Sequence, residues 1–149
     1  MTIDILEATE ADLPAILNLY SQPELDDGTM LSLPDAKALF NRMHQYPNYR
    51  LYVAKLDGSI VGTFALLVMD NLLHLGRPSG IVEAVAVDPA CQGKGIGKAM
   101  MRFALEQCRH ARCYKLALST NLKRKDAHAF YESLGFTKHG FSFVVDLTV

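Results

Sequence analysis

Residues 82–98 read VEAVAVDPACQGKGIGK, in which a β-strand pattern runs through a turn into a glycine-rich segment that opens a helix. Glycines at alternate positions of residues 93–97 remove the side chains that would keep an anion away from the main chain. The first N–H groups of a helix lack partners within it and carry its positive dipole end, and Lys94 and Lys98 add positive charge beside them. We interpret the stretch as a phosphate-binding turn, with a tight strand-to-helix turn that binds nothing as the alternative.

The glycine spacing excludes two familiar nucleotide-binding motifs. A dinucleotide fingerprint needs glycines at its first, third and sixth positions, but here the third glycine is Gly97, at the fifth position, and Lys98 holds the sixth. No acidic residue stands about 20 residues further on, where the chain reads Tyr114–Ser119. A Walker loop needs Ser or Thr after Gly-Lys, whereas Ala99 follows Lys98.

The rest of the chain alternates strand-like and helix-like patterns. Asp57-Gly58 is typical of a tight hairpin turn, and Gly135 is typical of a residue that ends a helix. In chain order we expect a strand at Ile3 and Ile5, a helix from Thr9 to Tyr20, a loop over Gln22–Leu31, a helix from Ser32 that stops before Pro47, paired strands over Tyr49–Leu56 and Ile60–Met69, an irregular segment over Asp70–Gly80, a strand over Ile81–Val87, a helix over Ile96–Arg109, a strand over Tyr114–Ser119, a helix over Asp126–Leu134 and a last strand over Phe141–Leu147. This order predicts one α/β domain over residues 1–149, with a mixed sheet and helices on its faces.

Composition excludes several classes of protein. Of the 149 residues, 50% are apolar and 21% are charged, which is the balance of a soluble globular protein rather than a disordered chain. A formal net charge of −1 provides no overall field toward nucleic acid or an anionic membrane. The longest near-apolar run, Ile60–Met69, is half of the roughly 20 residues that a spanning helix needs, and Met1–Asp4 has no secretory pattern. Three cysteines without a repeating spacing favour a reducing compartment, so we expect a cytoplasmic protein.

Three motifs carry a resemblance to a known family. Residues 92–97, QGKGIG, fit the pattern of Gln or Arg, two residues, Gly, one residue, then Gly or Ala, and residues 85–89 and 127–136 match the family's flanking patterns at the right separation. The chain therefore resembles the GNAT superfamily of acyl-coenzyme A-dependent N-acetyltransferases. The Glu83 strand, residues 113–115 and residues 130–132 also give a weaker likeness to the glucosamine-phosphate N-acetyltransferases.

The resemblance implies a fold and a cosubstrate. The fold is a single-domain α/β (mixed α+β) GNAT-like fold, with a central mixed, mostly antiparallel sheet and helices on both faces. The cosubstrate is acetyl-CoA, whose pantetheine arm pairs with the strand through Val85 and Val87 while the Val85 N–H donates to the acetyl carbonyl. The pyrophosphate is held by the turn formed by Gln92, Gly93, Lys94, Gly95, Ile96, Gly97 and Lys98.

Two residues are candidate catalytic groups. An amine must lose its proton before it attacks a thioester, and Glu83 is the candidate base, acting directly or through water; the alternative is a strand-end carboxylate paired with a lysine or arginine. By resemblance, Tyr131 corresponds to the tyrosine that protonates the departing thiolate, and the alternative is that Phe130 and Tyr131 only form the apolar face of a helix. Direct transfer needs no covalent enzyme intermediate, so no cysteine is assigned as a nucleophile.

One position departs from the family pattern. Many members carry Asn seven residues before the tyrosine, where it contacts the cofactor, and here that position is Arg124. Either Asn121 takes this role or Arg124 binds a phosphate instead. The run Lys123-Arg124-Lys125 is either a contact for the 3′-phosphate or a solvated basic loop.

The acceptor is the least determined part of the hypothesis. Glu24, Asp26 and Asp27 favour a cationic amine, whereas Arg77 and His74 favour an acidic or phosphorylated one. We expect a primary amine of a small molecule, no metal, no nucleic acid and no membrane. The alternatives are an acyl-CoA-binding regulatory module without turnover and a protein N-acetyltransferase. Hydrophobic strand edges are compatible with a homodimer, which the sequence does not decide.

Overall fold

The computed structural model describes residues 1–26 and 29–148. They form two compact units, Met1–Ala117 and Leu118–Val149, and each unit is described by itself. The single domain over residues 1–149 stays a prediction.

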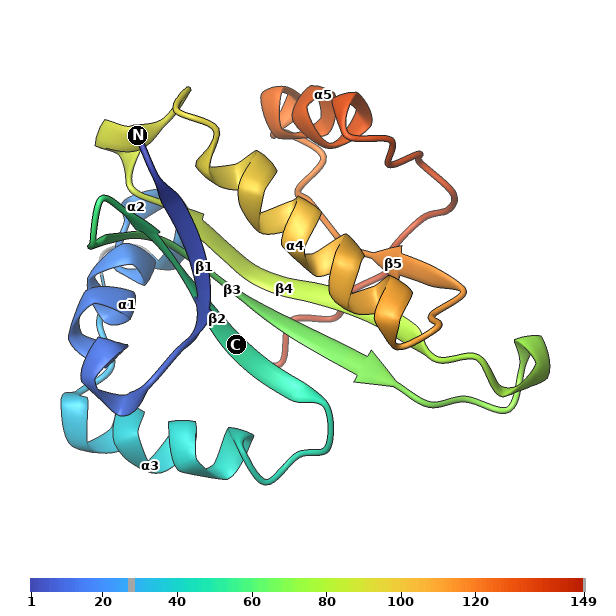
Figure 1. Ribbon diagram of the computed structural model, residues 1–149, viewed down its shortest axis with the longest axis horizontal. Coiled ribbons are helices and arrows are strands. Elements are labelled where there is room, and N and C mark those ends of the chain that lie inside the picture. Colours follow the sequence, from blue (N-terminus) through green and yellow to red (C-terminus); the bar gives the residue numbers. More distant parts are fainter. Residues whose placement is uncertain (27–28, 149) are drawn as a thin grey trace. The chain divides into compact units, whose positions relative to one another are not determined.

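The first unit is built on a five-stranded sheet whose strands follow the chain order (Figure 1). The three pairs β1–β2, β2–β3 and β3–β4 are antiparallel, and β4 and β5 run parallel over a short stretch. This confirms a mixed, mostly antiparallel sheet. The strands are β1 (Ile3–Glu7), β2 (Tyr49–Leu56), β3 (Ser59–Met69), β4 (Ser79–Val87) and β5 (Lys115–Ala117).

The β2–β3 hairpin confirms the turn expected at Asp57-Gly58. Both residues have positive φ, 49° and 89°, as a two-residue turn of this kind requires. The backbone N–H of Asp57 also donates to the Thr2 carbonyl at 3.0 Å, and the Thr2 N–H donates to the Asp57 carboxylate at 3.0 Å. The turn thereby holds the start of β1 in place.

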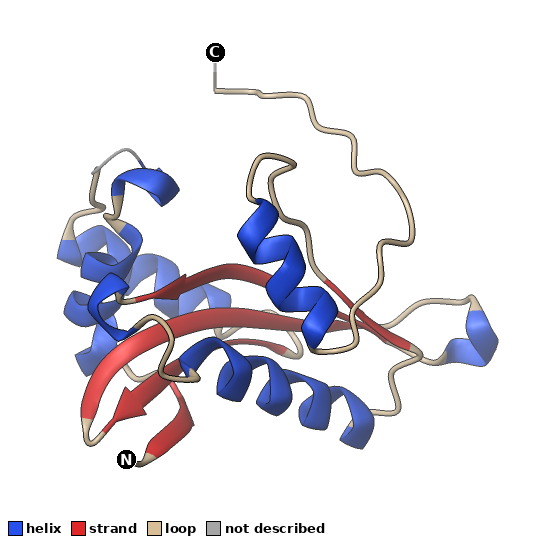
Figure 2. Ribbon diagram, turned by 90° about the horizontal axis from the view of Figure 1, so that it is seen from above, coloured by secondary structure: helices blue, strands red, loops and turns tan. Residues whose placement is uncertain are grey.

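Helices cover both faces of the sheet in this unit, as expected (Figure 2). Because side chains alternate along a strand, Leu51 and Ala65 face the core formed with α1 and α3, while the Tyr52 and Phe64 rings contact Phe103 of α4. No helix in residues 1–26 or 29–148 is long and apolar enough to cross a membrane. The helices of this unit are α1 (Leu13–Tyr20), α2 (Pro23–Asp26), α3 (Leu33–Met43) and α4 (Ile96–His110), with 3-10 turns at Glu10–Asp12, His74–Gly76 and Pro89–Cys91.

Two expectations about the elements are wrong. The loop expected over Gln22–Leu31 contains the short helix α2, which begins at Pro23. The strand expected over Phe141–Leu147 is absent, and in the described part of the second unit, residues 118–148, the one element is α5 (Lys125–Ser133). The segment has the alternation of a strand, but it pairs with no described residue, and Phe141 and Phe143 are 89% and 93% exposed. A strand pattern produces a strand only where a partner supplies hydrogen bonds.

Candidate functional site

The strand β4 has a paired half and an open half. Residues Ser79–Ile81 pair with β3 on one side and with β5 on the other. From Val82 to Val87 the strand pairs only with β3, because β5 ends at Ala117, opposite Ile81. In the first unit, the outer edge of this half is therefore a row of main-chain groups that an extended molecule can pair with.

A β-bulge distorts the open half. Ala86 lies opposite Thr63 and Glu83 opposite Ala65, so Ala84 and Val85 together oppose a single residue of β3. Ala84 has φ 52°, in the left-handed region that alanine rarely adopts. The bulge changes the direction of the main-chain groups at Val85, the residue whose N–H is expected to donate to an acetyl carbonyl.

Two side chains that sequence reasoning missed hold the bulged segment. The Tyr20 hydroxyl donates to the Ala84 carbonyl at 2.9 Å, and Gln22 Nε2 donates to the Val87 carbonyl at 3.1 Å. Tyr20 reads in the sequence as the end of the apolar face of a helix, and Gln22 as a loop residue, so neither carries a signal of this role. Burial raises the pKa of Tyr20 to about 12, which keeps its hydroxyl protonated and able to donate.

The glycine-rich turn follows β4 directly and opens α4. Gly93 and Gly95 have φ 81° and 82°, and Gly95 stands at the N-cap of the helix. The first hydrogen bond of the helix runs from the Ala99 N–H to the Gly95 carbonyl at 3.0 Å. No described residue accepts from the amides of the positions Gly93, Gly95, Ile96, Gly97 and Lys98.

The turn is suited to an anion. Unpaired amides at a helix N-terminus attract negative charge, and the flanking Lys94 and Lys98 side chains are exposed. A Cβ added at Gly93 or Gly95 would meet no atom within 4 Å, so the space above the turn is open. The open edge of β4 and these donors are consecutive in the chain, which suits a ligand with an extended arm and a phosphate group.

Glu83 projects from the open half of β4 toward the face covered by α1 and α3. It lies opposite Ala65, which belongs to the core on that face, and its own side chain is exposed. Burial, and then the nearby negative charge of Glu83, raise the pKa of Tyr49 on the same face. Among the described residues Glu83 has no ion-pair partner, so the alternative of a carboxylate paired with a lysine or arginine is not supported there.

The second unit contains Tyr131, Arg124 and Asn121. Tyr131 lies in α5, with ring centroids 5.1 Å from Phe130 and 5.7 Å from Phe136. Burial raises the pKa of the Tyr131 phenol, and the positive charge of Arg124 opposes this, so the phenol is protonated at neutral pH. The Asn121 side-chain oxygen accepts from the Lys123 N–H at 2.9 Å, which uses it in the turn before α5.

Two of the residues expected to recognise the acceptor, Arg77 and His74, already contact other residues of the first unit. Arg77 donates to the carbonyls of Arg112 and Cys113 at 3.0 and 3.3 Å, and the His74 ring stacks on Tyr114 at 3.8 Å. This leaves Arg77 fewer free donors for an anionic substrate than its sequence position suggested. Of the expected acidic residues, Asp27 lies outside the described part of the chain, and Glu24 and Asp26 lie in α2.

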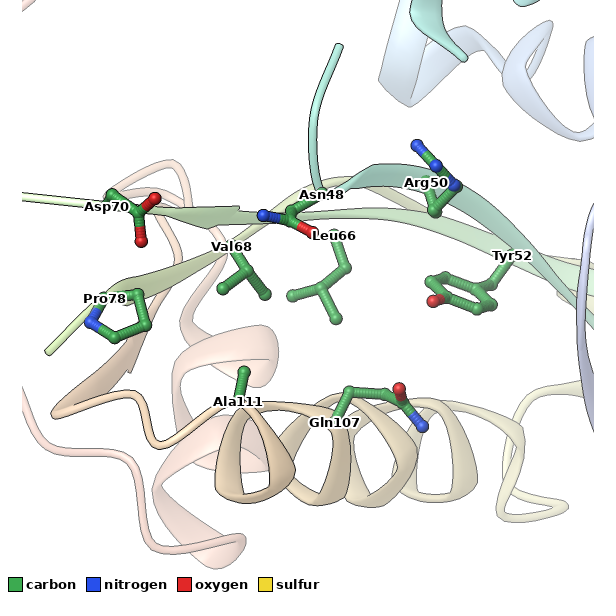
Figure 3. Close-up of a pocket in the computed structure, with 9 residues that line it drawn as sticks. All are labelled: Asn48, Arg50, Tyr52, Leu66, Val68, Asp70, Pro78, Gln107 and Ala111. Atoms are coloured by element: carbon green, nitrogen blue, oxygen red, sulfur yellow. The ribbon is translucent and has the colours of Figure 1, made fainter. Parts of the chain in front are cut away.

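A cavity of about 310 Å³ lies between the sheet and α4 (Figure 3). It is lined by Gln107 from the last turn of α4 and by Ala111 just after that helix, across from Tyr52 of β2 and from Leu66 and Val68 of β3. Because α4 rises about 1.5 Å per residue, the cavity lies on the order of 15 Å or more from the glycine-rich turn. It therefore belongs to a different region from the open edge of β4 and lies on the sheet face opposite Glu83.

Comparisons with known proteins show the family of the chain. The chain matches the model of the acetyltransferase (GNAT) family over residues 13–136. A glucosamine 6-phosphate N-acetyltransferase of Trypanosoma brucei brucei is 38% identical over 98 residues, which are 66% of this chain and 65% of that protein. An aminoalkylphosphonate N-acetyltransferase of Salmonella typhimurium is 35% identical over 97 residues, 65% of this chain and 62% of that protein. The chain thus spans just under two thirds of the length of these relatives.

A solved structure shares the fold over nearly the whole chain. The crystal structure of a transcriptional regulator from Bacillus halodurans C-125 has a TM-score of 0.89 and 27% sequence identity, covering 98% of this chain and 100% of that one. The family match confirms the resemblance drawn from the glycine-rich turn and its flanking motifs.

Proposed function

Because the chain belongs to the acetyltransferase (GNAT) family, we propose that it transfers an acetyl group from acetyl-CoA directly to a primary amine of a small molecule, without a metal. The observation that carries the proposal is the open, bulged half of β4, which leads straight into a turn of unpaired amides. The edge suits a pantetheine arm, with Val85 and Val87 as its partners, and the turn Gln92–Lys98 suits a pyrophosphate. Either Arg124 or Asn121 adds a further contact to the cofactor.

Glu83 acts as the base in this proposal. An alkyl ammonium group with a pKa of about 10 must be deprotonated to attack, and an exposed carboxylate without an ion-pair partner in the described residues is free to accept the proton, directly or through water. The Val85 N–H donates to the carbonyl oxygen, which gains negative charge as the nitrogen attacks.

Tyr131 acts as the acid. Its phenol carries a proton at neutral pH because the ordinary pKa of tyrosine is about 10 and burial raises the Tyr131 pKa further, and it passes that proton to the departing thiolate. The amine nitrogen attacks the thioester directly, so the reaction needs no covalent enzyme intermediate. The proton that Glu83 takes from the amine and the proton that Tyr131 gives to the thiolate cancel in the overall reaction.

The acceptor in this proposal carries a phosphate or phosphonate group beside its amine. Support comes from the names of two relatives, which act on glucosamine 6-phosphate and on aminoalkylphosphonates. The sequence also offered a cationic amine, which acidic residues such as Glu24 and Asp26 would favour. These residues would repel a phosphate if they faced it, so a cationic acceptor and a phosphorylated acceptor predict opposite results.

The test is release of free coenzyme A thiol from acetyl-CoA with matched pairs of amines: glucosamine 6-phosphate against glucosamine, and 2-aminoethylphosphonate against ethanolamine. We expect turnover with the phosphorylated or phosphonylated member of at least one pair. Tyr131→Phe should lower kcat by about 10²-fold or more while the affinity for coenzyme A stays within about twofold. Tyr114→Phe removes a phenol outside the proposed site and serves as the control. Normal turnover of Tyr131→Phe would remove this residue as the acid.

One observation favours a second candidate, an acyl-CoA-binding regulatory module without turnover. The solved structure from Bacillus halodurans C-125, with a TM-score of 0.89, is named a transcriptional regulator. This candidate predicts tight coenzyme A binding without thiol release for any amine. A protein acceptor instead predicts that labelled acetyl groups appear in the protein fraction of a cell extract.

A further inference from the structure

Two cysteines lie at the end of α4, away from the proposed cofactor edge. Cys108 belongs to the last turn of the helix, and Cys113 follows shortly after the helix ends at His110. The Cys113 N–H donates to the Cys108 carbonyl at 2.9 Å, and the Arg112 N–H donates to the Arg109 carbonyl at 3.0 Å. Arg112 has φ 63°. These two bonds and the left-handed residue define a Schellman motif.

The motif brings the two thiols together. In a Schellman motif the side chains at the positions of Cys108 and Cys113 frequently contact each other, and here the two thiols are hydrogen-bonding neighbours. Cys108 is 4% exposed and packs against Gly80, where an added Cβ would overlap its Sγ. Cys113 is only half-buried, and its carbonyl accepts from the Arg77 guanidinium at 3.3 Å. Packing on one side and this hydrogen bond on the other hold the pair in place.

We propose that Cys108 and Cys113 are a site of reversible oxidation, in which hydrogen peroxide converts the two thiols into an intramolecular disulfide. The Cys113 thiolate attacks the peroxide, forms a sulfenic acid and releases hydroxide, which is protonated to water. The Cys108 thiol then attacks the sulfenic sulfur, the S–S bond forms and a second water leaves. The two sulfurs lose two electrons, and the peroxide gains them.

The order of the two steps follows from exposure. Burial, with the neighbouring Cys113 thiol as a second cause, raises the pKa of Cys108 to about 12, so this residue is a poor first nucleophile. Cys113 is the accessible partner. The third cysteine, Cys91, lies before the start of α4. Cys108 lies twelve residues after the first residue of that helix, Ile96, at a rise of about 1.5 Å per residue. Within one chain Cys91 therefore has no partner in reach.

The bond would join the end of α4 to the residues that enter β5, beside the paired half of β4. The turn at Gly95 lies at the opposite end of α4, so oxidation should leave coenzyme A binding unchanged. Thiol pairs of this kind in reducing compartments are typically transient and sense oxidants.

Trypsin makes the test sharp, because it cleaves after Arg109 and after Arg112 and so separates the two cysteines. The reduced full chain is treated with hydrogen peroxide, unfolded, alkylated without reductant and digested. Before alkylation, the intact mass of the oxidised chain should be about 2 Da lower than that of the reduced chain, because the two thiol hydrogens are lost. The peptide Phe103–Arg109 should be joined to Cys113–Lys115, Cys91 should be alkylated, and dithiothreitol should reverse the link.

The control is Cys113→Ser, which changes the more exposed member and is checked for folding by circular dichroism. It should show neither the mass loss nor the joined peptides. The proposal is overturned if Cys108 is alkylated in the oxidised chain while Cys113 carries two added oxygens. It is also overturned if the joined peptides occur only in a covalent dimer on a non-reducing gel.

Discussion

The two halves of β4 differ in their strand pairing and in their burial. Ser79–Ile81 is paired on both sides, Ser79 and Gly80 are buried, and Gly80 lies against Cys108. Val82–Val87 is paired on one side only, contains a bulge and exposes Glu83 and Ala84. The paired half has no room for a Cβ at Gly80, whereas the open half leaves main-chain groups unpaired along its outer edge. The point where β5 stops pairing therefore separates a structural region from the proposed binding region.

The open half depends on its neighbours for its shape. A left-handed alanine costs roughly 1–2 kcal/mol, which an isolated strand would avoid by straightening. The hydrogen bonds from Tyr20 and Gln22 to the carbonyls of the bulged segment offset this cost. Changes in the paired half should therefore act on stability, and changes in the open half on turnover.

The largest effect is expected in the open half, at Glu83. Glu83→Gln should lower kcat by about 10²-fold at low pH, or about 2.7 kcal/mol, because the amine is then charged and needs a base. The deficit should shrink as the pH approaches the amine pKa of about 8 to 10. A pH–rate profile measures this. Urea unfolding should change by less than about 0.5 kcal/mol, because the side chain is exposed. A deficit that is constant across pH would exclude Glu83 as the base.

A change in the paired half should lower the stability of the fold and leave the binding of coenzyme A unchanged. Gly80→Ala places a Cβ against Cys108 Sγ and 3.1 Å from Leu116 Cδ1, so we expect a loss of about 1–3 kcal/mol in the free energy of unfolding. The affinity for coenzyme A should not change. Urea unfolding and calorimetric titration measure the two quantities.

The matched control for this variant is Gly140→Ala, since a Cβ at Gly140 meets nothing within 4 Å. Combining Gly80→Ala with Cys108→Ala should recover part of the loss. A Gly80→Ala chain with unchanged stability and weakened coenzyme binding would reverse the assignment of the two halves.

The smallest effect is expected where the first helix meets the bulge. Tyr20→Phe removes the donor to the Ala84 carbonyl and should cost about 0.5–1.5 kcal/mol in the free energy of unfolding. The Tyr20 pKa is raised from 10.0 to about 12 in the folded state, so its contribution is complete below pH 10 and declines as the pH rises to 12. Urea unfolding at pH 8 and pH 11 should show less pH sensitivity in the variant. An equal decline in both proteins would contradict this linkage.

The sequence predicts best where structure is local. The Asp57-Gly58 turn and the start of α4 after Gly95 depend on residues that adopt positive φ, and both were predicted from residue type. The Ala84 bulge was not, because alanine carries no preference for that conformation and the bulge arises from pairing with β3. The same holds for Phe141–Leu147, whose alternation is that of a strand although no described residue pairs with it.

The candidate site divides in the same way. The turn amides and Glu83 were found from a motif that is continuous in the chain. Tyr20 and Gln22 were not found, because they contact β4 across more than 60 positions of sequence. Arg77 reads as a free cation in the sequence, but the Schellman motif at the end of α4 presents two carbonyls that bind it.

Amide hydrogen exchange with and without acetyl-CoA tests the central claim most directly, namely that the ligand pairs with the open half of β4 and with the turn that follows. We predict that acetyl-CoA slows exchange in peptides covering residues 82–98 and leaves Ser79–Ile81 and the cavity residues near Gln107 unchanged. Unaltered exchange over residues 82–98 at saturating acetyl-CoA, or protection confined to the cavity beside Gln107, would contradict the account.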